Sequence, residues 1–165
     1  MRRSPLSGAT QVLEAAKRHE VGYEKPTPVQ AGLIPLAMEE FDLIGQSQTG
    51  TGKTAAFGIP ILEQLEMDPQ HAVTQALILT PTRELAVQVE REITKLAPNH
   101  HVRCCCLYGG RPIKTQINQL KKGCHIVVGT PGRVLDHLQR RTLNINKLWF
   151  VVLDEADRML DIGFR

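Results

Sequence analysis

The stretch SQTGTGKT, at residues 47–54, has the residue types and spacing of a loop that binds phosphate groups. Glycines let backbone N–H groups close around phosphate oxygens, and the helix expected behind the loop adds a partial positive charge. Lys53 would reach the terminal phosphates, and the Thr54 hydroxyl would hold Mg²⁺. The strict pattern has glycine at the first position, where a small serine still permits the turn. We expect a nucleoside triphosphate site formed by Ser47, Gln48, Thr49, Gly50, Thr51, Gly52, Lys53 and Thr54.

A second group of candidate residues follows the apolar run FVVL, as Asp154-Glu155-Ala156-Asp157. Phosphoryl transfer with Mg²⁺ needs a carboxylate that holds the metal and a group that orients the attacking water. Asp154 suits the first role and Glu155 the second. The alternative is an acidic helix start, because Asp and Glu stabilise a first turn by about 0.3–1 kcal/mol. Given the phosphate loop, we predict that Lys53, Asp154 and Glu155 are catalytic and that Thr54 and Asp154 are metal ligands.

Arginines occupy the first turns of two expected helices, where a cation opposes the helix dipole by about 0.3–1 kcal/mol. Arg83 follows Pro81-Thr82 and has Glu84 beside it, whereas Arg133 follows Thr130-Pro131 and has no acidic neighbour before Asp136. Each arginine taken singly fits an ordinary surface residue. A phosphate backbone would satisfy both arginines, the helix N–H groups and the glycines Gly109-Gly110 together. We therefore expect a long polyanion, distinct from the nucleotide, as a second ligand.

The elements that must position these residues alternate between strand and helix. Short runs rich in Val, Ile and Leu predict strands at 42–45, 76–80, 102–108, 125–130 and 148–153. Helical stretches lie between them, at 52–66 and 82–97, and the first forty residues favour two helices, the second starting at Thr27-Pro28. The order predicts an α/β fold, a parallel sheet with helices on both faces. Ligands of such sheets bind at the carboxyl ends of the strands, where the candidate residues fall.

The length, net charge and hydrophobic content of the chain are those of one soluble domain. The chain has 165 residues, a net charge of +3 and 42% hydrophobic residues, without an apolar run long enough for a membrane span or a secretory signal at the N-terminus. This favours a cytoplasmic protein, a nuclear location being left open. Cys104-Cys105-Cys106 and Cys124 lack metal-ligand or disulfide spacing, so we interpret them as buried thiols. A metal role for His100-His101, in an expected loop, is the less favoured interpretation.

On these residues the sequence resembles the DEAD-box RNA helicases of superfamily 2. Besides the phosphate loop and Asp154-Glu155-Ala156-Asp157, PTRELA (81–86) resembles motif Ia of that family, Gly109-Gly110 its GG motif, TPGR (130–133) its motif Ib and GYEKPTPVQ (22–30) its Q motif. The order of the motifs matches the first RecA-like domain over essentially the whole chain, which implies a RecA-like P-loop fold.

The resemblance implies further roles. Gln30 would read the adenine edge of ATP, with Tyr23 packing nearby and Thr27 supporting the loop, whereas the sequence alone favours a surface position for Gln30. Asp157 would couple the ATP site to other motifs. The sugar-phosphate backbone of single-stranded RNA would be held without base reading by Pro81, Thr82, Arg83, Gly109, Gly110, Arg111, Thr130, Pro131, Gly132 and Arg133.

The sequence departs from the family pattern at both ends. The aromatic residue expected upstream of the Q motif is absent from SPLSG (4–8), and the Ser-Ala-Thr motif expected after the acidic tetrad does not occur by Arg165. We expect that the sheet therefore lacks its last strands, that a second RecA-like domain lies outside this sequence, and that the chain alone is inactive. Two alternatives stay open: an ATP-gated RNA clamp that does not unwind processively, and a DNA-acting ATPase of the same superfamily.

Overall fold

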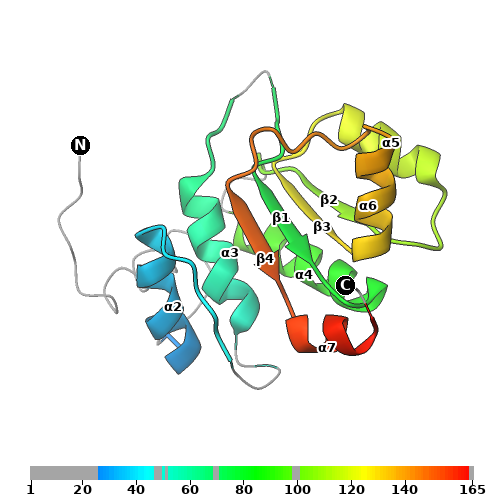
Figure 1. The fold of residues 1–165 in the computed structure, drawn as a ribbon. Helices are drawn as coiled ribbons and strands as arrows, with labels where there is room; N and C mark the ends of the chain where they lie inside the picture. The colour runs from blue at the N-terminus through cyan, green and yellow to red at the C-terminus, as the bar shows by residue number, and fades with distance from the viewer. Residues whose placement is uncertain (1–25, 47–49, 51, 69–70, 98–100, 164–165) are drawn as a thin grey trace. The chain divides into compact units, whose positions relative to one another are not determined.

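A computed structural model describes residues 26–46, 50, 52–68, 71–97 and 101–163. Within them, contacts group into two compact units, one within residues 1–64 and 95–98 and the other within residues 65–94 and 99–165. The elements run in the order α2 (Pro28–Met38), α3 (Lys53–Gln64), β1 (Ala76–Leu79), α4 (Arg83–Leu96), β2 (Cys104–Leu107), α5 (Ile113–Lys121), β3 (Ile126–Gly129), α6 (Pro131–Gln139), β4 (Phe150–Leu153) and α7 (Ala156–Asp161), as Figure 1 shows.

The second unit is built on a parallel sheet with strand order β2-β3-β1-β4. The register places Ala76 of β1 opposite Ile126 of β3 and Phe150 of β4. All four strands lie within the ranges predicted from the sequence, each one to three residues shorter. The apolar runs that predicted them pair into a mostly buried sheet, because strands covered on both faces need apolar side chains on both.

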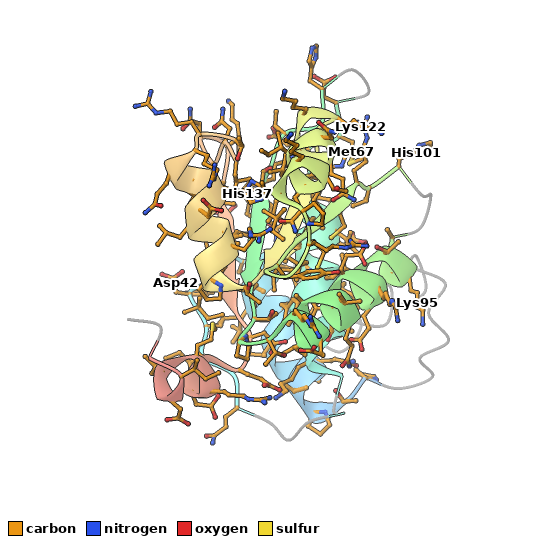
Figure 2. The ribbon with its side chains drawn as sticks, turned by 90° about the vertical axis from the view of Figure 1, so that its right-hand side faces the viewer. Asp42, Met67, Lys95, His101, Lys122 and His137 are labelled. Atoms are coloured by element: carbon orange, nitrogen blue, oxygen red, sulfur yellow. The ribbon has the colours of Figure 1, made fainter. Side chains whose placement is uncertain are left out.

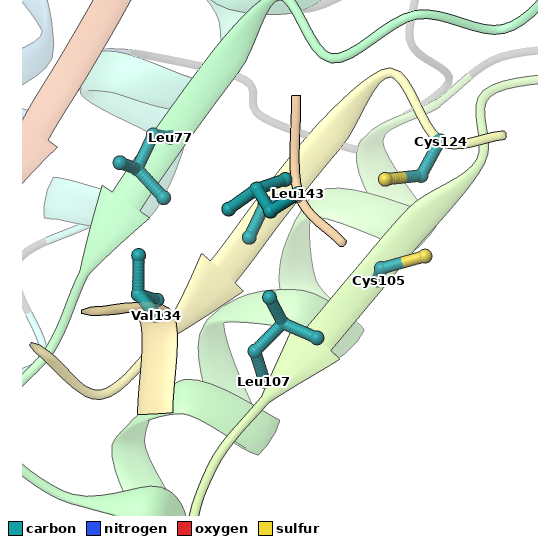
Figure 3. Packing of buried hydrophobic residues seen from close by; sticks show 7 residues of the cluster. Leu77, Cys105, Leu107, Cys124, Val134 and Leu143 are labelled. Atoms are coloured by element: carbon teal, nitrogen blue, oxygen red, sulfur yellow. The ribbon is translucent and has the colours of Figure 1, made fainter. Parts of the chain in front are cut away.

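Helices cover both faces of this sheet, which confirms the predicted α/β architecture. On one face Leu77, Cys105 and Val127 pack with Val134 of α6 and with Leu143 (Figure 3). The next residues along each strand point to the opposite face, behind which α4 lies in Figure 1. Along α4 the buried side chains recur every three or four residues, at Ala86, Val89 and Ile93, as a helix packed on a sheet requires.

The strand predicted at 42–45 is wrong: residues 41–46 belong to no helix or strand. A segment becomes a strand by pairing its N–H and C=O groups with a neighbour. No described strand pairs with this segment, and Ile44 is fully exposed. Among the described strands, β4 pairs with β1 alone. On one of its faces Val151 and Leu153 are each more than half exposed.

In the first unit α2 begins as the sequence predicted, with Thr27 as the N-cap and Pro28 in the first turn. Its buried side chain Ile34 packs with Ala55 and Ile59 of α3 and with Leu96. The helix expected before α2 lies outside the described residues. None of the helices in the described ranges combines the length and the apolar character that crossing a membrane requires.

Candidate nucleotide and polyanion sites

Gln30 joins the start of α2 to the glycine-rich loop. Thr27 and Gln30 form a reciprocal capping box, in which the Thr27 N–H donates to Gln30 Oε1 at 3.0 Å and the Gln30 N–H donates to Thr27 Oγ1 at 3.4 Å. Gln30 Nε2 also donates to the carbonyl of Gly52 at 3.2 Å. The side chain is 1% exposed, so the surface position favoured by the sequence alone is wrong. These bonds use one donor and one acceptor of an amide that has two of each.

The described part of the phosphate loop has the backbone geometry that a glycine-rich anion loop needs. Gly50 and Gly52 both have φ of +79°, in the left-handed region that favours glycine. A Cβ added at Gly52 would collide with Gln30 Nε2. Lys53 opens α3 directly behind the turn, so the N–H groups of the first helical turn face the loop, as in anion-binding helix starts. Ser47, Gln48, Thr49, Thr51 and Tyr23 lie outside the described residues.

In the second unit, the four strands end at one edge of the sheet. The parallel ladder continues one residue beyond the strands through three bonds, from the N–H of Thr130 to Leu107 O at 2.9 Å, of Thr80 to Gly129 O at 3.0 Å and of Asp154 to Leu79 O at 2.9 Å. The segments after β2, β3, β1 and β4 therefore leave the sheet side by side. This is the common edge at which the sequence predicted that the candidate residues would gather.

The acidic tetrad lies where β4 passes into α7. Glu155 is the N-cap of α7 and has φ of 53° and ψ of 49°, a left-handed conformation that is uncommon outside glycine. Its Oε2 lies 3.2 Å from Arg158 Nη1. Asp157 is in the first turn of the same helix. Strained backbone conformations of this kind cost about 1–3 kcal/mol. Glu40 and Arg141 have similar φ values, 64° and 55°, so the sequence motif, and not the backbone alone, makes Glu155 the functional candidate.

Arg83 lies beside the glycine turn that follows β2. The position that a Cβ would take on Gly110 is 3.5 Å from Arg83 Nη1, and Gly110 has φ of +84°. Arg83 Nε also donates to Glu84 Oε1 at 2.7 Å. This hydrogen bond raises the pKa of the Arg83 guanidinium and lowers that of the Glu84 carboxyl. Both side chains are mostly exposed, so the pair leaves the guanidinium accessible to a ligand at the edge.

Arg133 reaches the same turn from α6. Its Nη1 donates to the carbonyl of Arg111 at 3.0 Å, and the Arg111 guanidinium lies over the Tyr108 ring, 5.6 Å from its centroid. Asp136, the nearest acidic residue in α6, pairs with Arg140 at 2.6 Å instead. The edge therefore gathers three guanidinium groups around Gly109-Gly110. A chain of phosphate groups is the ligand class that this arrangement fits.

Two buried polar residues of this unit escaped the sequence analysis. Gln116 and His137 are both 0% exposed. Each falls within an apolar stripe at helical spacing, Gln116 with Ile113 and Leu120, and His137 with Val134. A polar residue in such a stripe was the signal available, and it indicates a hydrogen-bond partner in the core.

The cysteines are partly as predicted. Cys105 and Cys124 are buried, whereas Cys104 and Cys106 are partly exposed, and all four are free thiols. A hydrogen bond from Cys105 lowers the pKa of the Cys124 thiol, and burial raises the pKa of Cys106 to about 12. No group of three or more His, Cys, Asp or Glu within the described residues is arranged to hold a metal ion.

Comparison with known proteins agrees with the motifs. The model of the DEAD/DEAH box helicase family matches residues 27–165. The chain is 51% identical, over 159 residues, to the DEAD-box ATP-dependent RNA helicase CshA of Geobacillus kaustophilus, a match that covers 96% of this chain and 33% of that protein. Identity to the ATP-dependent RNA helicase CshA of Listeria monocytogenes is 53% over 146 residues, or 88% of this chain and 28% of that protein.

The fold has a solved counterpart. The crystal structure of a DEAD box protein from the hyperthermophile Methanococcus jannaschii superposes with a TM-score of 0.83 at 45% identity, covering 93% of this chain and 41% of that one. The chain spans about a third of the length of the curated relatives that it matches. Motifs, sheet topology and comparisons agree that this chain belongs to the DEAD/DEAH box helicase family.

Proposed function

We propose that the chain is the ATP- and RNA-binding part of an ATP-dependent RNA helicase, which opens short stretches of RNA duplex as it binds and hydrolyses ATP. The observation that carries the proposal is the shared edge of the second unit. There Arg83, Gly110 and Arg133 converge at strand ends beside Asp154-Glu155. An edge that combines a polyanion surface with phosphoryl-transfer carboxylates fits an enzyme that couples nucleotide hydrolysis to RNA binding. The relatives' printed names, ATP-dependent RNA helicases, support the same activity.

The proposal includes the domain organisation. Residues 1–165 would belong to the first RecA-like domain, with residues 22–30 as its Q motif. A second RecA-like domain would lie elsewhere in the full-length protein, since the relatives extend well beyond the matched region. Alone, the chain would not turn over ATP efficiently. A cytoplasmic location, with a nuclear one left open, is part of the same proposal.

The described residues fit ATP and Mg²⁺. Gly50 and Gly52 have the left-handed φ of +79° that a glycine-rich anion loop needs, and the start of α3 supplies N–H groups for phosphate oxygens. The hydroxyl of Thr54 and the carboxylate of Asp154 are oxygen donors, which Mg²⁺ prefers. When bound, Mg²⁺ neutralises charge on the phosphates. Lys53 would contact the terminal phosphates, Glu155 would orient the attacking water, and Gln30 would use its remaining donor and acceptor on the adenine edge.

The polyanion edge would hold RNA through its backbone. The N–H groups at the starts of α4 and α6 and of the glycine turn would donate hydrogen bonds to phosphate oxygens, with Arg83, Arg111 and Arg133 supplying charge. None of these groups reads a base, so binding would be independent of sequence. Asp157 would link this edge to the nucleotide site.

The test uses the full-length protein and compares ATPase rate and strand separation with RNA and with DNA of the same sequence. We expect RNA to stimulate hydrolysis and a short RNA duplex to open, and we expect Arg133→Ala to weaken RNA binding without changing nucleotide affinity. Equal stimulation of the ATPase rate by DNA and RNA would indicate a DNA-acting ATPase instead. Retention of RNA in the presence of ATP without strand separation would indicate an ATP-gated RNA clamp.

A further inference from the structure

A chain of buried polar groups joins α6 to the backbone next to the glycine turn. His137 of α6 is labelled in Figure 2. Its Nδ1 lies 2.8 Å from Thr142 Oγ1, and its Nε2 lies 3.1 Å from Gln116 Oε1. Gln116 of α5 in turn donates from Nε2 to the carbonyl of Tyr108 at 2.9 Å. Burying polar side chains is unfavourable unless they are hydrogen-bonded, and here each of them is.

The direction of these hydrogen bonds follows from the last group in the series, the Tyr108 carbonyl. A carbonyl only accepts, so the amide nitrogen of Gln116 must face Tyr108 and its oxygen must face His137. The His137 Nε2 therefore carries the proton and donates to Gln116 Oε1. The Thr142 hydroxyl donates to the His137 carbonyl at 3.1 Å and also lies 2.8 Å from His137 Nδ1. Two bonds thus run one way, from His137 through Gln116 to the Tyr108 carbonyl, and reversing either of them would oppose two acceptors.

The chain of bonds ends beside the residues proposed to hold RNA. Tyr108 immediately precedes Gly109-Gly110, and the carbonyl of Arg111, immediately after them, accepts from Arg133 Nη1 at 3.0 Å. The glycine turn is thus held from α6 on both sides. At Arg111 the link is a direct bond from Arg133, and at Tyr108 it runs from His137 through Gln116. His137 lies one helical turn beyond Arg133, so both links start from the same helix.

The bonds to the carbonyls of Tyr108 and Arg111 matter because the glycines of the turn have no side chains that could fix its position. Two surfaces bind one RNA backbone together only when their spacing matches that of successive phosphates. Apolar side chains at 116 and 137 would fill the space, but they would not set the spacing, since packing is far less directional than a hydrogen-bond chain.

We propose that His137 and Gln116 are positioning residues for the RNA backbone site, which hold the glycine turn in register with the start of α6. This inference rests on the proposed RNA-binding function of that edge. It assigns the two residues no contact with RNA and no part in the chemistry.

The experiment measures single-stranded RNA affinity against salt concentration in the full-length protein. His137→Phe keeps a ring but removes both nitrogens, and Gln116→Met keeps the length but removes the amide. His137→Gln places an amide donor near the position of Nε2 and serves as the rescue. Leu143→Ala is the matched control, because it shortens an apolar side chain of the same core and keeps every polar side chain, its own bond to the His137 carbonyl coming from the backbone N–H. Affinity for a fluorescent ATP analogue is recorded for each variant.

We expect His137→Phe and Gln116→Met to weaken RNA binding about tenfold and to lower the salt slope by roughly the 0.7 that one lost phosphate contact represents. The double variant should be no weaker than either single one, because both remove the same link. His137→Gln should recover the slope, and Leu143→Ala should lower the thermal midpoint with the slope unchanged.

Wild-type affinity and slope in folded His137→Phe would overturn the inference. If His137→Phe fails to fold, Gln116→Met and His137→Gln decide alone, and a normal slope in Gln116→Met overturns it. A normal RNA affinity in Arg133→Ala would instead contradict the proposed function of the edge.

Discussion

The side-chain amide of Gln30 donates to the backbone carbonyl of Gly52 at 3.2 Å while its oxygen accepts from the N–H of Thr27. One buried side chain thus ties the Q motif to the phosphate loop. Adenine recognition by Gln30 would therefore depend on the same amide that supports the loop backbone.

Gln30→Glu tests this double role. The change removes the N–H donor to the Gly52 carbonyl and places a carboxylate oxygen against that carbonyl. A buried acceptor left without its donor costs about 1–3 kcal/mol. We expect ATP affinity to fall about tenfold or more and discrimination against GTP to narrow, measured by titration with fluorescent nucleotides. Gln64→Ala is the control, because it removes a glutamine bonded to the Ala37 carbonyl in the same unit. Unchanged nucleotide selectivity in Gln30→Glu would contradict the assigned role.

Glu155→Gln should separate nucleotide binding from turnover. The variant keeps the size of the side chain and loses its basicity, so the water would no longer be oriented for attack, a loss of about 10²–10⁴-fold for a missing general base. We expect ATP affinity within about twofold of wild type and a turnover at least 100-fold lower, measured in the full-length protein with saturating RNA. Asp161→Asn, on the same short helix, should leave turnover unchanged. A normal rate of ATP hydrolysis in Glu155→Gln would show that another residue orients the attacking water.

The two glycines of the turn make a matched pair. Gly110 has φ of +84°, whereas Gly109 lies outside the left-handed region, and neither would bring a Cβ closer than 3.5 Å to a neighbour. We expect Gly110→Ala to lower the free energy of unfolding by about 1–2 kcal/mol, the cost of a left-handed alanine. Gly109→Ala should change it by less than about half of that. Chemical denaturation of both variants measures the difference, and equal losses would show that backbone strain is not the cause.

How far the sequence predicts the structure depends on the range of the interactions. The four strands of the second unit were predictable because runs such as IVVG carry their burial in their own composition. The common edge followed from the direction of the strands alone. By contrast, the segment 42–45 has strand-like composition and still lacks a partner. Composition reports the preference of a segment, whereas pairing depends on a neighbour elsewhere in the chain.

The residues that the sequence placed wrongly or missed act over long separations. Gln30 bonds to a loop 22 positions away, and Gln116 to a histidine 21 positions away. Neither relation has a local pattern beyond a polar residue in a helix. The left-handed Glu155 was hidden for a different reason, since its conformation is imposed by the surrounding turn against its own preference.

Acidification should destabilise the fold through two buried histidines. Burial lowers the pKa of His125, assisted by Arg103. Burial also lowers the pKa of His137, where Arg133 and Arg140 assist and Asp136 opposes. Between these lowered values and the unfolded value of about 6.5 the unfolded chain binds more protons, so stability rises with pH. The contribution is therefore complete above about pH 6.5 and is lost progressively as the pH falls below it.

Chemical denaturation between about pH 8 and pH 5 measures this effect as a loss of unfolding free energy at the acidic end. In His137→Gln the decline below about pH 6.5 should be shallower, because one proton-binding difference is removed. His125→Asn should act in the same way, since the Nδ1 of His125 accepts from the Arg103 N–H at 3.0 Å and an asparagine oxygen can take that role. His101→Gln, at an exposed position, is the control. An identical pH profile in His137→Gln and wild type would show that the buried imidazole does not contribute.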